Sequence, residues 1–264
     1  MSERLKNGLG LLRSLLIYRR PGRQRALRRF YRVFVQPGDR VFDVGAHLGD
    51  RTTAFAALGA RVLALEPQPR LFAWLQRLVG RHEAVTCLPL AVGSEPGTLE
   101  LATSRTNPTV ASLSPQWRAR VVQAQPGFAG VNWDSRLRVE VTTLDHLIAH
   151  YGEPVFCKID VEGFEPEVLA GLSRPLAALS VEFVAGALDQ ALACVERLEQ
   201  LGAYRYQVVE GERREFFLAE WMDAEAIRAW LEAGAGGLAS GDLYARRSVN
   251  GGDGGAKNHA HRLV

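Results

Sequence analysis

Apolar residues follow two alternating spacings along most of the chain. Short, nearly continuous runs of Val, Leu and Ala predict strands, and these runs occupy residues 40–44, 61–65, 85–92, 137–142, 155–159, 179–184 and 204–209. Between them, apolar residues recur at helical spacing and predict helices at residues 52–58, 70–79, 144–150, 165–172 and 187–201. Apolar strands separated by helices indicate an α/β fold, in which helices cover both faces of a parallel sheet.

Other segments do not follow this alternation. Residues 97–102 predict a strand that pairs with the strand at 85–92 or extends the sheet. Two late strand candidates lie at residues 216–218 and 242–246. Residues 103–137 are rich in Thr, Ser, Pro, Gln and Trp and are too long for an ordinary connection. We therefore expect one domain over residues 38–247 with an insertion or lid at 103–137, followed by a disordered tail at 248–264.

The formal net charge of +3 is distributed unevenly. Residues 1–40 contain eleven Lys and Arg against two acidic residues, so the remainder of the chain is acidic. This basic segment predicts two helices, at residues 5–18 and 23–35, in an N-terminal extension over residues 1–37. Its apolar residues at helical spacing are expected to face the core, among them Leu27, Phe30 and Phe34. The extension is then a lid or accessory segment, and its arginines form mainly a solvated face.

Cysteine and histidine patterns exclude several common classes of site. The three cysteines are widely spaced, at Cys87, Cys157 and Cys194, and form no CxxC motif, so zinc ribbons and disulfide frameworks are not expected. His146 and His150 lie four residues apart without an HExxH motif, which favours an exposed helix face. No apolar run reaches the ~20 residues that span a bilayer. A reducing cytoplasm is the simplest compartment.

Residues 41–52 read Val-Phe-Asp-Val-Gly-Ala-His-Leu-Gly-Asp-Arg-Thr, a glycine loop between a strand and a helix. The loop lacks both GxGxxG and the P-loop motif, so it is not built for a dinucleotide or a nucleoside triphosphate. S-adenosylmethionine has a ribose, an adenine and an amino-acid tail but no phosphate. Glu66 ends the second strand, where an acid can accept hydrogen bonds from ribose hydroxyls. The alternative is an ordinary turn followed by an exposed glutamate.

A second signature lies at residues 156–165, which read Phe-Cys-Lys-Ile-Asp-Val-Glu-Gly-Phe-Glu. It is a buried strand that ends in acidic residues, at the sheet edge where functional groups gather in open parallel sheets. Buried charges are costly unless they are paired or functional. In the structural alternative, Lys158 and Asp160 only pair with each other, while Glu162 and Glu165 stabilise the start of the next helix.

Together these motifs resemble the FkbM-type family of S-adenosylmethionine-dependent methyltransferases. The matching stretches are residues 42–49, 66–67, 91–93, 97–99, 143–145, 158–165 and 180–183. The most specific is Lys-Ile-Asp-Val-Glu-Gly, and one variation is His47, where many relatives carry Asn. The resemblance implies a Rossmann-like class I methyltransferase fold, a seven-stranded and mostly parallel sheet with an antiparallel last hairpin, for which residues 204–209 and 242–246 are candidates. It also implies methyl transfer to a hydroxyl, often on a sugar or polyketide-like natural product.

The resemblance and the strand positions assign roles to individual residues. Those expected to bind the cofactor are Asp43, Gly45, His47, Gly49, Thr52, Glu66 and Ala91. Among them, Asp43 is placed to meet the amino group of the cofactor, Glu66 to hold the ribose, and Ala91 to flank the adenine. A hydroxyl acceptor must lose its proton to a base; Asp160 is the first candidate, with Glu162 and Glu182 as alternatives. These carboxylates also have the chemistry to hold a divalent cation, although no metal is predicted.

Two rival functions remain open. The basic extension is typical of proteins that bind nucleic acid, but no Asn/Asp-Pro-Pro-aromatic motif follows the fourth strand, so no specific nucleic acid is expected as a partner. A non-catalytic protein of this fold would use the basic extension to bind a partner or an anionic membrane. The acceptor is either neutral or anionic. Trp117 and Trp133 either stack on it or anchor the insertion. The oligomeric state is not predicted.

Overall fold

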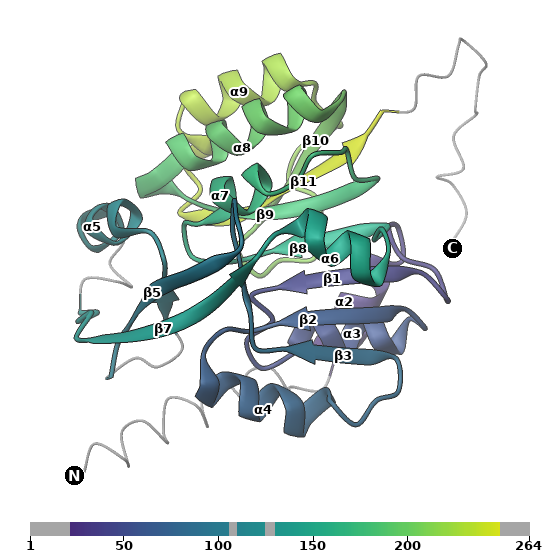
Figure 1. Cartoon of the computed structure of the whole chain (residues 1–264). Coiled ribbons are helices and arrows are strands. Elements are labelled where there is room, and N and C mark those ends of the chain that lie inside the picture. Colours follow the sequence, from purple (N-terminus) through teal and green to yellow (C-terminus); the bar gives the residue numbers. More distant parts are fainter. Residues whose placement is uncertain (1–21, 106–109, 125–129, 249–264) are drawn as a thin grey trace.

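The computed structural model describes residues 22–105, 110–124 and 130–248 (Figure 1). The predicted helix at residues 5–18 and nearly all of the expected tail lie outside these ranges. The centre of the molecule is a seven-stranded sheet in the order β10-β11-β9-β8-β1-β2-β3. No helix of the described part of the chain has the length and the apolar character that crossing a membrane requires.

The central sheet has the strand directions that the sequence predicts. Its parallel strands are β1 (Arg40–Val44), β2 (Arg61–Leu65), β3 (Val85–Leu88), β8 (Phe156–Ile159), β9 (Ala178–Val184) and β10 (Tyr204–Glu210). The last strand, β11 (Ser240–Arg247), is antiparallel to both β9 and β10. The expected seven-stranded, mostly parallel sheet with an antiparallel last hairpin is therefore confirmed. Its strand order reverses between β1 and β8, where parallel α/β sheets open a crevice at their carboxyl ends.

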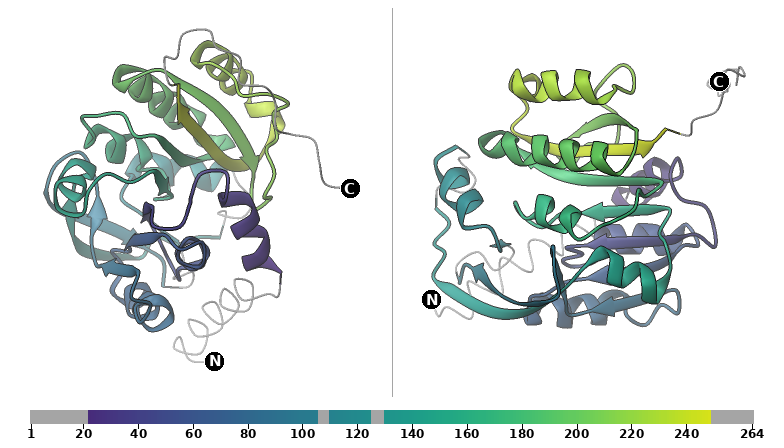
Figure 2. Two further views of the ribbon diagram at one scale, coloured as in Figure 1. Left: turned by 90° about the vertical axis from the view of Figure 1, so that its right-hand side faces the viewer. Right: turned by 45° about the horizontal axis from the view of Figure 1, so that its top comes forward.

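Helices cover both faces of this sheet (Figure 2). Beyond the extension they are α3 (Asp50–Ala57), α4 (Pro69–Val79), α6 (Leu144–Tyr151), α7 (Glu165–Ala170), α8 (Leu188–Leu201) and α9 (Ala224–Glu232). Successive residues of a strand point to opposite faces. Phe42 and Val44 accordingly pack in one core with residues of α6, α7 and α8, while Val41 packs in the other with α3 and α4. The sequence analysis missed α9, although Asp223 caps it by accepting a hydrogen bond from the amide of Ala226.

The strand predicted at residues 85–92 is wrong as a single element. It divides into β3 and β4 (Ala91–Val92), and β4 belongs to a second, four-stranded sheet in the order β4-β7-β5-β6. Pro89 lies between the two parts and has no amide hydrogen, so it cannot continue the hydrogen-bond ladder with β2. The chain therefore leaves the central sheet at this proline.

The other corrections concern the second sheet and one late strand. The strand predicted at residues 97–102 exists as β5 (Gly97–Thr103). It pairs with β7 (Ser135–Thr142) and β6 (Ala111–Ser112), not with the strand at 85–92, and it does not extend the central sheet. Figure 1 shows β5 and β7 to one side of that sheet. Residues 216–218 form no strand, although the amide of Phe217 donates one hydrogen bond to the carbonyl oxygen of Val208 in β10.

Residues 103–137 contain β6, the helix α5 (Pro115–Ala124) and the start of β7. Trp117 in α5 is buried, with 2% of its surface exposed. A Cβ atom on Gly163 would lie 2.1 Å from the Trp117 side chain, so the ring packs directly on the backbone of the Lys-Ile-Asp-Val-Glu-Gly motif. Trp133 contacts it edge-on, with ring centroids 6.4 Å apart. Trp117 therefore anchors the insertion to the body of the protein, one of the two roles expected for it.

The basic extension contributes one described helix, α2 (Arg23–Tyr31), which ends earlier than the predicted residue 35. Leu27 and Phe30 are buried, as expected, against residues of α3 and the sheet. Arg25 and Arg29 are exposed, in agreement with a solvated arginine face. Arg23 departs from this pattern, because its side chain turns inward to an ion pair with Asp50. The helix is therefore part of the folded core.

Candidate active site

A cavity of about 320 Å³ opens at the carboxyl ends of the central strands, where the strand order reverses. Eight of the predicted site residues line it: Asp43, Gly45, His47, Glu66, Ala91, Asp160, Glu162 and Glu182. Gly49 and Thr52 do not line it, and no described residue of α2 does. The cavity brings together the glycine loop, the acid that ends β2 and the acids that follow β8.

Close packing of the loop after β1 determines where its glycines stand. Gly45 has a φ of 80°, and a Cβ atom there would lie 1.9 Å from the backbone oxygen of Asp160. Only glycine lets the loop pass this close to the end of β8. Gly49 has a φ of 79°, and its Cβ position lies 2.8 Å from the side chain of Leu75 in α4. Both glycines thus allow the loop to fit between neighbouring elements, and Gly49 acts behind the cavity.

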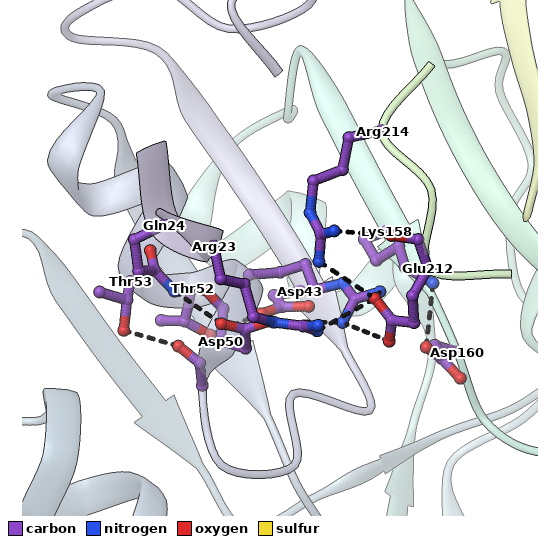
Figure 3. Close-up of polar contacts among 12 residues, drawn as sticks. Arg23, Gln24, Asp43, Asp50, Thr52, Thr53, Lys158, Asp160, Glu212 and Arg214 are labelled. Carbon is purple, nitrogen blue, oxygen red and sulfur yellow. Dashed lines mark hydrogen bonds and ion pairs between the residues drawn. The ribbon is translucent and has the colours of Figure 1, made fainter. Parts of the chain in front are cut away.

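Asp43 is a buried carboxylate at the end of β1 that reaches the cavity (Figure 3). One of its oxygens accepts a hydrogen bond of 2.5 Å from the hydroxyl of Thr52. Burial raises the pKa of Asp43, and this hydrogen bond opposes the rise. The hydroxyl of Thr52 therefore orients Asp43 from behind, which explains why Thr52 does not line the cavity itself.

Glu66 is fixed by the backbone of two loops. Its Oε2 accepts a hydrogen bond from the amide of His47 at 3.1 Å, and its Oε1 accepts one from the amide of Gln68 at 2.9 Å. Burial raises its pKa to about 7, although these two hydrogen bonds oppose the rise. An ionised carboxylate has about four lone-pair sites. Glu66 therefore retains acceptor capacity towards the cavity that it lines.

Lys158 is a buried cation beneath the acids of the cavity. Its Nζ lies 3.0 Å from Asp160 and 2.9 Å from Asp242 of β11. Burial would raise the pKa of Asp160, but the positive charges of Lys158 and Arg51 outweigh burial and hold that pKa below its usual value. Asp160 is therefore ionised at neutral pH. The ion pair between Lys158 and Asp160 that the sequence suggested is therefore present, and both residues line the cavity.

The pKa values of Glu162 and Glu182 are shifted in the opposite direction from that of Asp160. Burial and the neighbouring negative charge of Asp160 raise the pKa of both groups well above the usual value. Both groups therefore hold their protons more tightly than an ordinary glutamate, and in the protonated form each is a donor as well as an acceptor. Glu162 also has a left-handed backbone, with a φ of 54°, and its carbonyl oxygen accepts a hydrogen bond of 2.7 Å from Ser112 of β6. The second sheet thus helps to hold this strained turn.

Several cavity residues were not predicted. One is Arg51, two residues after Gly49, which its position beside the glycine loop could have indicated. Another is Glu212, from the loop after β10. Apolar side chains from the second sheet and the insertion complete the lining, namely Leu101, Val110, Ala111 and Leu113. No local pattern marks Glu212, because it lies 161 residues from Arg51 in the sequence and reaches it only in the folded chain.

The side chains of the site show no metal-binding arrangement. Within residues 22–105, 110–124 and 130–248, no three or more His, Cys, Asp and Glu side chains are grouped to hold a metal ion. Asp160, one of the three carboxylates considered for a divalent cation, is paired with Lys158. His146 and His150 are exposed on α6 with ring centroids 4.2 Å apart, which agrees with the exposed helix face that was predicted.

Several known proteins are similar to this chain. The chain resembles the precorrin-6y C5,15-methyltransferase of Geobacter metallireducens at 14% identity, with 85% of this chain and 87% of that chain covered and a TM-score of 0.44. A TehB-like SAM-dependent methyltransferase of Corynebacterium glutamicum has 12% identity, coverage of 84% and 88%, and a TM-score of 0.43. No curated protein shows significant sequence similarity to the chain. Residues 43–236, from Asp43 at the glycine loop to beyond α9, match the methyltransferase FkbM domain. The chain therefore belongs to the FkbM family of S-adenosylmethionine-dependent methyltransferases.

Proposed function

We propose that this methyltransferase transfers the methyl group to a hydroxyl oxygen, with Asp160 as the base. The observation that carries the proposal is the shared cavity. It joins the glycine loop and Glu66 on one side to Asp160 and its neighbouring acids on the other. Catalysis of a displacement depends chiefly on holding donor and acceptor in line. One cavity that contacts both groups of residues meets this requirement.

The residues present fit S-adenosylmethionine. Glu66 is held by two backbone amides and has remaining acceptor sites for the two ribose hydroxyls. Asp43 offers a buried negative charge to the amino group of the cofactor, directly or through water. Ala91 contributes an apolar surface to the cavity, which suits the adenine. The cofactor supplies an activated methyl group, and the role of the chain is to orient it.

The assignment of the base follows from the protonation states. Asp160 is ionised at neutral pH and can accept a proton, whereas the raised pKa values of Glu162 and Glu182 favour their protonated forms. A low pKa makes Asp160 a weak base. An alcohol, however, becomes strongly acidic as its oxygen forms the new bond to carbon, so a weak carboxylate can take the proton at that stage. Glu162 and Glu182 are then suited to donate hydrogen bonds to the acceptor.

The proposed acceptor is a sugar, a glycan or a polyketide-like molecule that carries a hydroxyl group. The second sheet and the insertion add apolar side chains to the cavity, among them Leu101 and Leu113, while the acids supply polar contacts. This mixture suits a hydroxyl on a partly apolar skeleton. We also propose a cytoplasmic location. All three cysteines are free thiols, and Cys157 and Cys194 are buried, which is compatible with a reducing compartment.

The test is methyl transfer to a panel of hydroxyl acceptors. The purified full chain is incubated with S-adenosylmethionine and sugars, glycans or polyketide-like alcohols, and mass spectrometry detects the gain of one methyl group. Asp160→Asn is expected to bind S-adenosylhomocysteine normally in calorimetry and to lose methyl transfer by about 10²-fold or more. Asp189→Asn, at an exposed surface site, is the matched control. Undiminished transfer by Asp160→Asn would refute the base assignment, and Glu162→Gln and Glu182→Gln would then identify the base.

A further inference from the structure

Three arginines from separate segments converge on one carboxylate at the edge of the cavity (Figure 3). Arg23 of α2 lies 3.0 Å from Glu212, and Arg51 of α3 lies 3.1 Å from it. Arg214 approaches the same oxygen at 3.5 Å. Arg51 grips the carboxylate with both of its terminal nitrogens, since its Nη1 also donates to Oε1 at 3.3 Å. We name Arg23, Arg51, Arg214 and Glu212 the arginine cradle.

Burial is unequal between the cations and the anion of the cradle. The side chain of Glu212 is 54% exposed, whereas those of Arg23 and Arg51 are 11% and 17% exposed. Arg51 and Glu212 both line the cavity. Buried guanidinium groups that meet a carboxylate through two donors are the usual means by which proteins bind carboxylates and phosphates. The guanidinium groups of Arg23 and Arg51 are thus held by burial, while the carboxylate of Glu212 that neutralises them is exposed to solvent.

The cradle has donors that its acids do not satisfy. Asp50 pairs with Arg23 at 2.6 Å, so the three guanidinium groups contact two carboxylates directly. Asp160 and Asp242 act on Arg51 at longer range. The Nε atoms of Arg51 and Arg214 are buried and, within the described part of the chain, have no hydrogen-bond partner. Buried donors without partners are rare and call for an explanation, such as a missing ligand. The cradle therefore has free donors on cationic groups to offer to a ligand.

The cradle also lies close to the proposed base. The positive charge of Arg51 helps to hold the pKa of Asp160 low, which places the two groups within electrostatic range of each other. An anion bound to the cradle would be adjacent to the cavity wall that carries Asp160. The loop that bears Glu212 connects β10 to α9 and begins at Gly211, whose φ is 45°. This loop is the element that must shift if Glu212 leaves the cradle.

We propose that the arginine cradle is an anion subsite, in which Glu212 occupies the place of a carboxylate or phosphate group of the ligand and is displaced when that ligand binds. Two parts of the reaction have this chemistry, the amino-acid carboxylate of the cofactor and an acidic group on the acceptor. The second source rests on the proposed function, because it assumes a hydroxyl acceptor in the same cavity. The first rests only on cofactor binding.

The decisive variant is Glu212→Gln, which removes the competing charge and retains the side-chain size. The probes are inorganic phosphate and glucuronate, with neutral glucose as the control compound, and binding is measured by calorimetry on the full chain without added cofactor. Glu212→Gln is expected to bind the anionic probes about three- to tenfold more tightly than the unmodified protein, and Arg51→Gln about tenfold more weakly. Arg213→Gln, in the same loop but 63% exposed, is expected to bind them unchanged.

A second measurement separates the two sources of the anion. S-adenosylhomocysteine has the amino-acid carboxylate, and 5′-methylthioadenosine lacks it. If Arg51→Gln and Arg214→Gln weaken only the former, the cradle holds the cofactor. If both compounds bind normally and the anionic probes do not, the cradle holds the acceptor. Unchanged binding of all probes in Glu212→Gln and both arginine variants would overturn the proposal. These assays involve no turnover, so their outcome is independent of the Asp160→Asn experiment.

Discussion

The ammonium group of Lys158 lies 3.0 Å from Asp160, and its side chain is only 1% exposed. The two residues are two positions apart at the end of β8, so their side chains leave the strand on the same face. Asp242 approaches the same ammonium from β11 at 2.9 Å. A buried lysine is thus compensated by two carboxylates, and one of these lines the cavity. This relationship keeps Asp160 ionised and leads to the first prediction.

Replacing Lys158 by Met is expected to shift the acidic limb of the pH dependence of kcat/KM to higher pH. The lysine now holds the pKa of Asp160 below its usual value, so its removal raises that pKa, and the base is protonated over more of the acidic range. The variant is also expected to lose about 3 kcal/mol of stability, because the buried carboxylate of Asp242 and the partly exposed carboxylate of Asp160 lose their partner. Urea unfolding measures the second effect.

Asp242→Asn serves as the control for the lysine variant. It retains the charge of Lys158 beside Asp160, so the acidic limb is not expected to move to higher pH.

The pH dependence of stability follows from the lowered pKa of Asp160. Its ionised form contributes stability above the unfolded pKa, and this contribution is lost as pH falls through the folded pKa. An identical acidic limb in Lys158→Met and the unmodified protein would contradict the role given to Lys158.

Cofactor affinity is expected to depend on pH through Glu66. The pKa of Glu66 in the free protein is raised to about 7, and the ionised form accepts hydrogen bonds from the ribose. Binding therefore releases a proton, so affinity for S-adenosylhomocysteine rises as pH increases to about 7 and is constant above it. Calorimetry in buffers of different ionisation enthalpy measures the proton release.

Two variants, Glu66→Gln and Glu165→Gln, test whether the pH dependence of cofactor affinity comes from Glu66 or from any buried carboxyl group with a raised pKa. Glu165 has a pKa that burial also raises to about 7, but it binds the amide of Val161 and does not line the cavity. Glu66→Gln is expected to bind the cofactor product at least about tenfold more weakly and without pH dependence. Glu165→Gln should retain the pH dependence. A pH-independent affinity in the unmodified protein would contradict the assignment of Glu66 to the ribose.

The stability of the free protein should change with pH in the opposite sense to cofactor affinity. Glu66 has a folded pKa of about 7, above the ordinary value of 4.5 that a solvent-exposed glutamate has in the unfolded chain. The folded state therefore binds more protons between these values, and stability falls as pH rises from 4.5 to about 7. Glu66→Gln should reduce this loss, so thermal unfolding at pH values across the window tests the prediction.

Gly45→Ala is expected to destabilise the loop severely. The added methyl group would lie 1.9 Å from the backbone oxygen of Asp160, and the φ of 80° is unfavourable for any residue with a side chain. A loss of about 3 kcal/mol or more is expected, together with weaker cofactor binding. Gly97→Ala is the matched control, because its Cβ position has no neighbour within 4 Å. Equal unfolding midpoints for the two variants would show that the contact at Gly45 is easily relieved.

Trp117→Ala tests whether the insertion is anchored through the signature motif. Its ring is buried against Gly163, so truncation is expected to cost about 3–5 kcal/mol. The turn at Glu162 should then be less well held, and KM for the acceptor should rise. Trp74→Ala, on α4 away from the insertion, should leave that KM unchanged. If both variants have the same effect on KM, the insertion has no special connection to the acceptor.

Local patterns in the sequence were sufficient for most of the central sheet. Each strand and helix there carries its own hydrophobic spacing, and the acids that follow β2 and β8 are adjacent in sequence to the strands that place them. Glu66 and Asp160 could therefore be assigned to one sheet edge before their contacts were known. The division of residues 85–92 at Pro89 could not be predicted, because it depends on tertiary pairing. The residues before the proline pair with β2, and those after it pair with β7 of the second sheet.

The sequence by itself determined the class of fold, the family and the acids of the site, because these depend on periodicity and on residues joined to a strand end. Only the tertiary structure decided which charges meet. Lys158 and Asp242 are 84 residues apart, and Arg51 and Glu212 are 161 residues apart. Their pairing follows from the packing of β11 beside β9 and of the loop after β10 beside α3. Electrostatic interactions act through space, so the lowered pKa of Asp160 and the arginine cradle arise only in the folded chain.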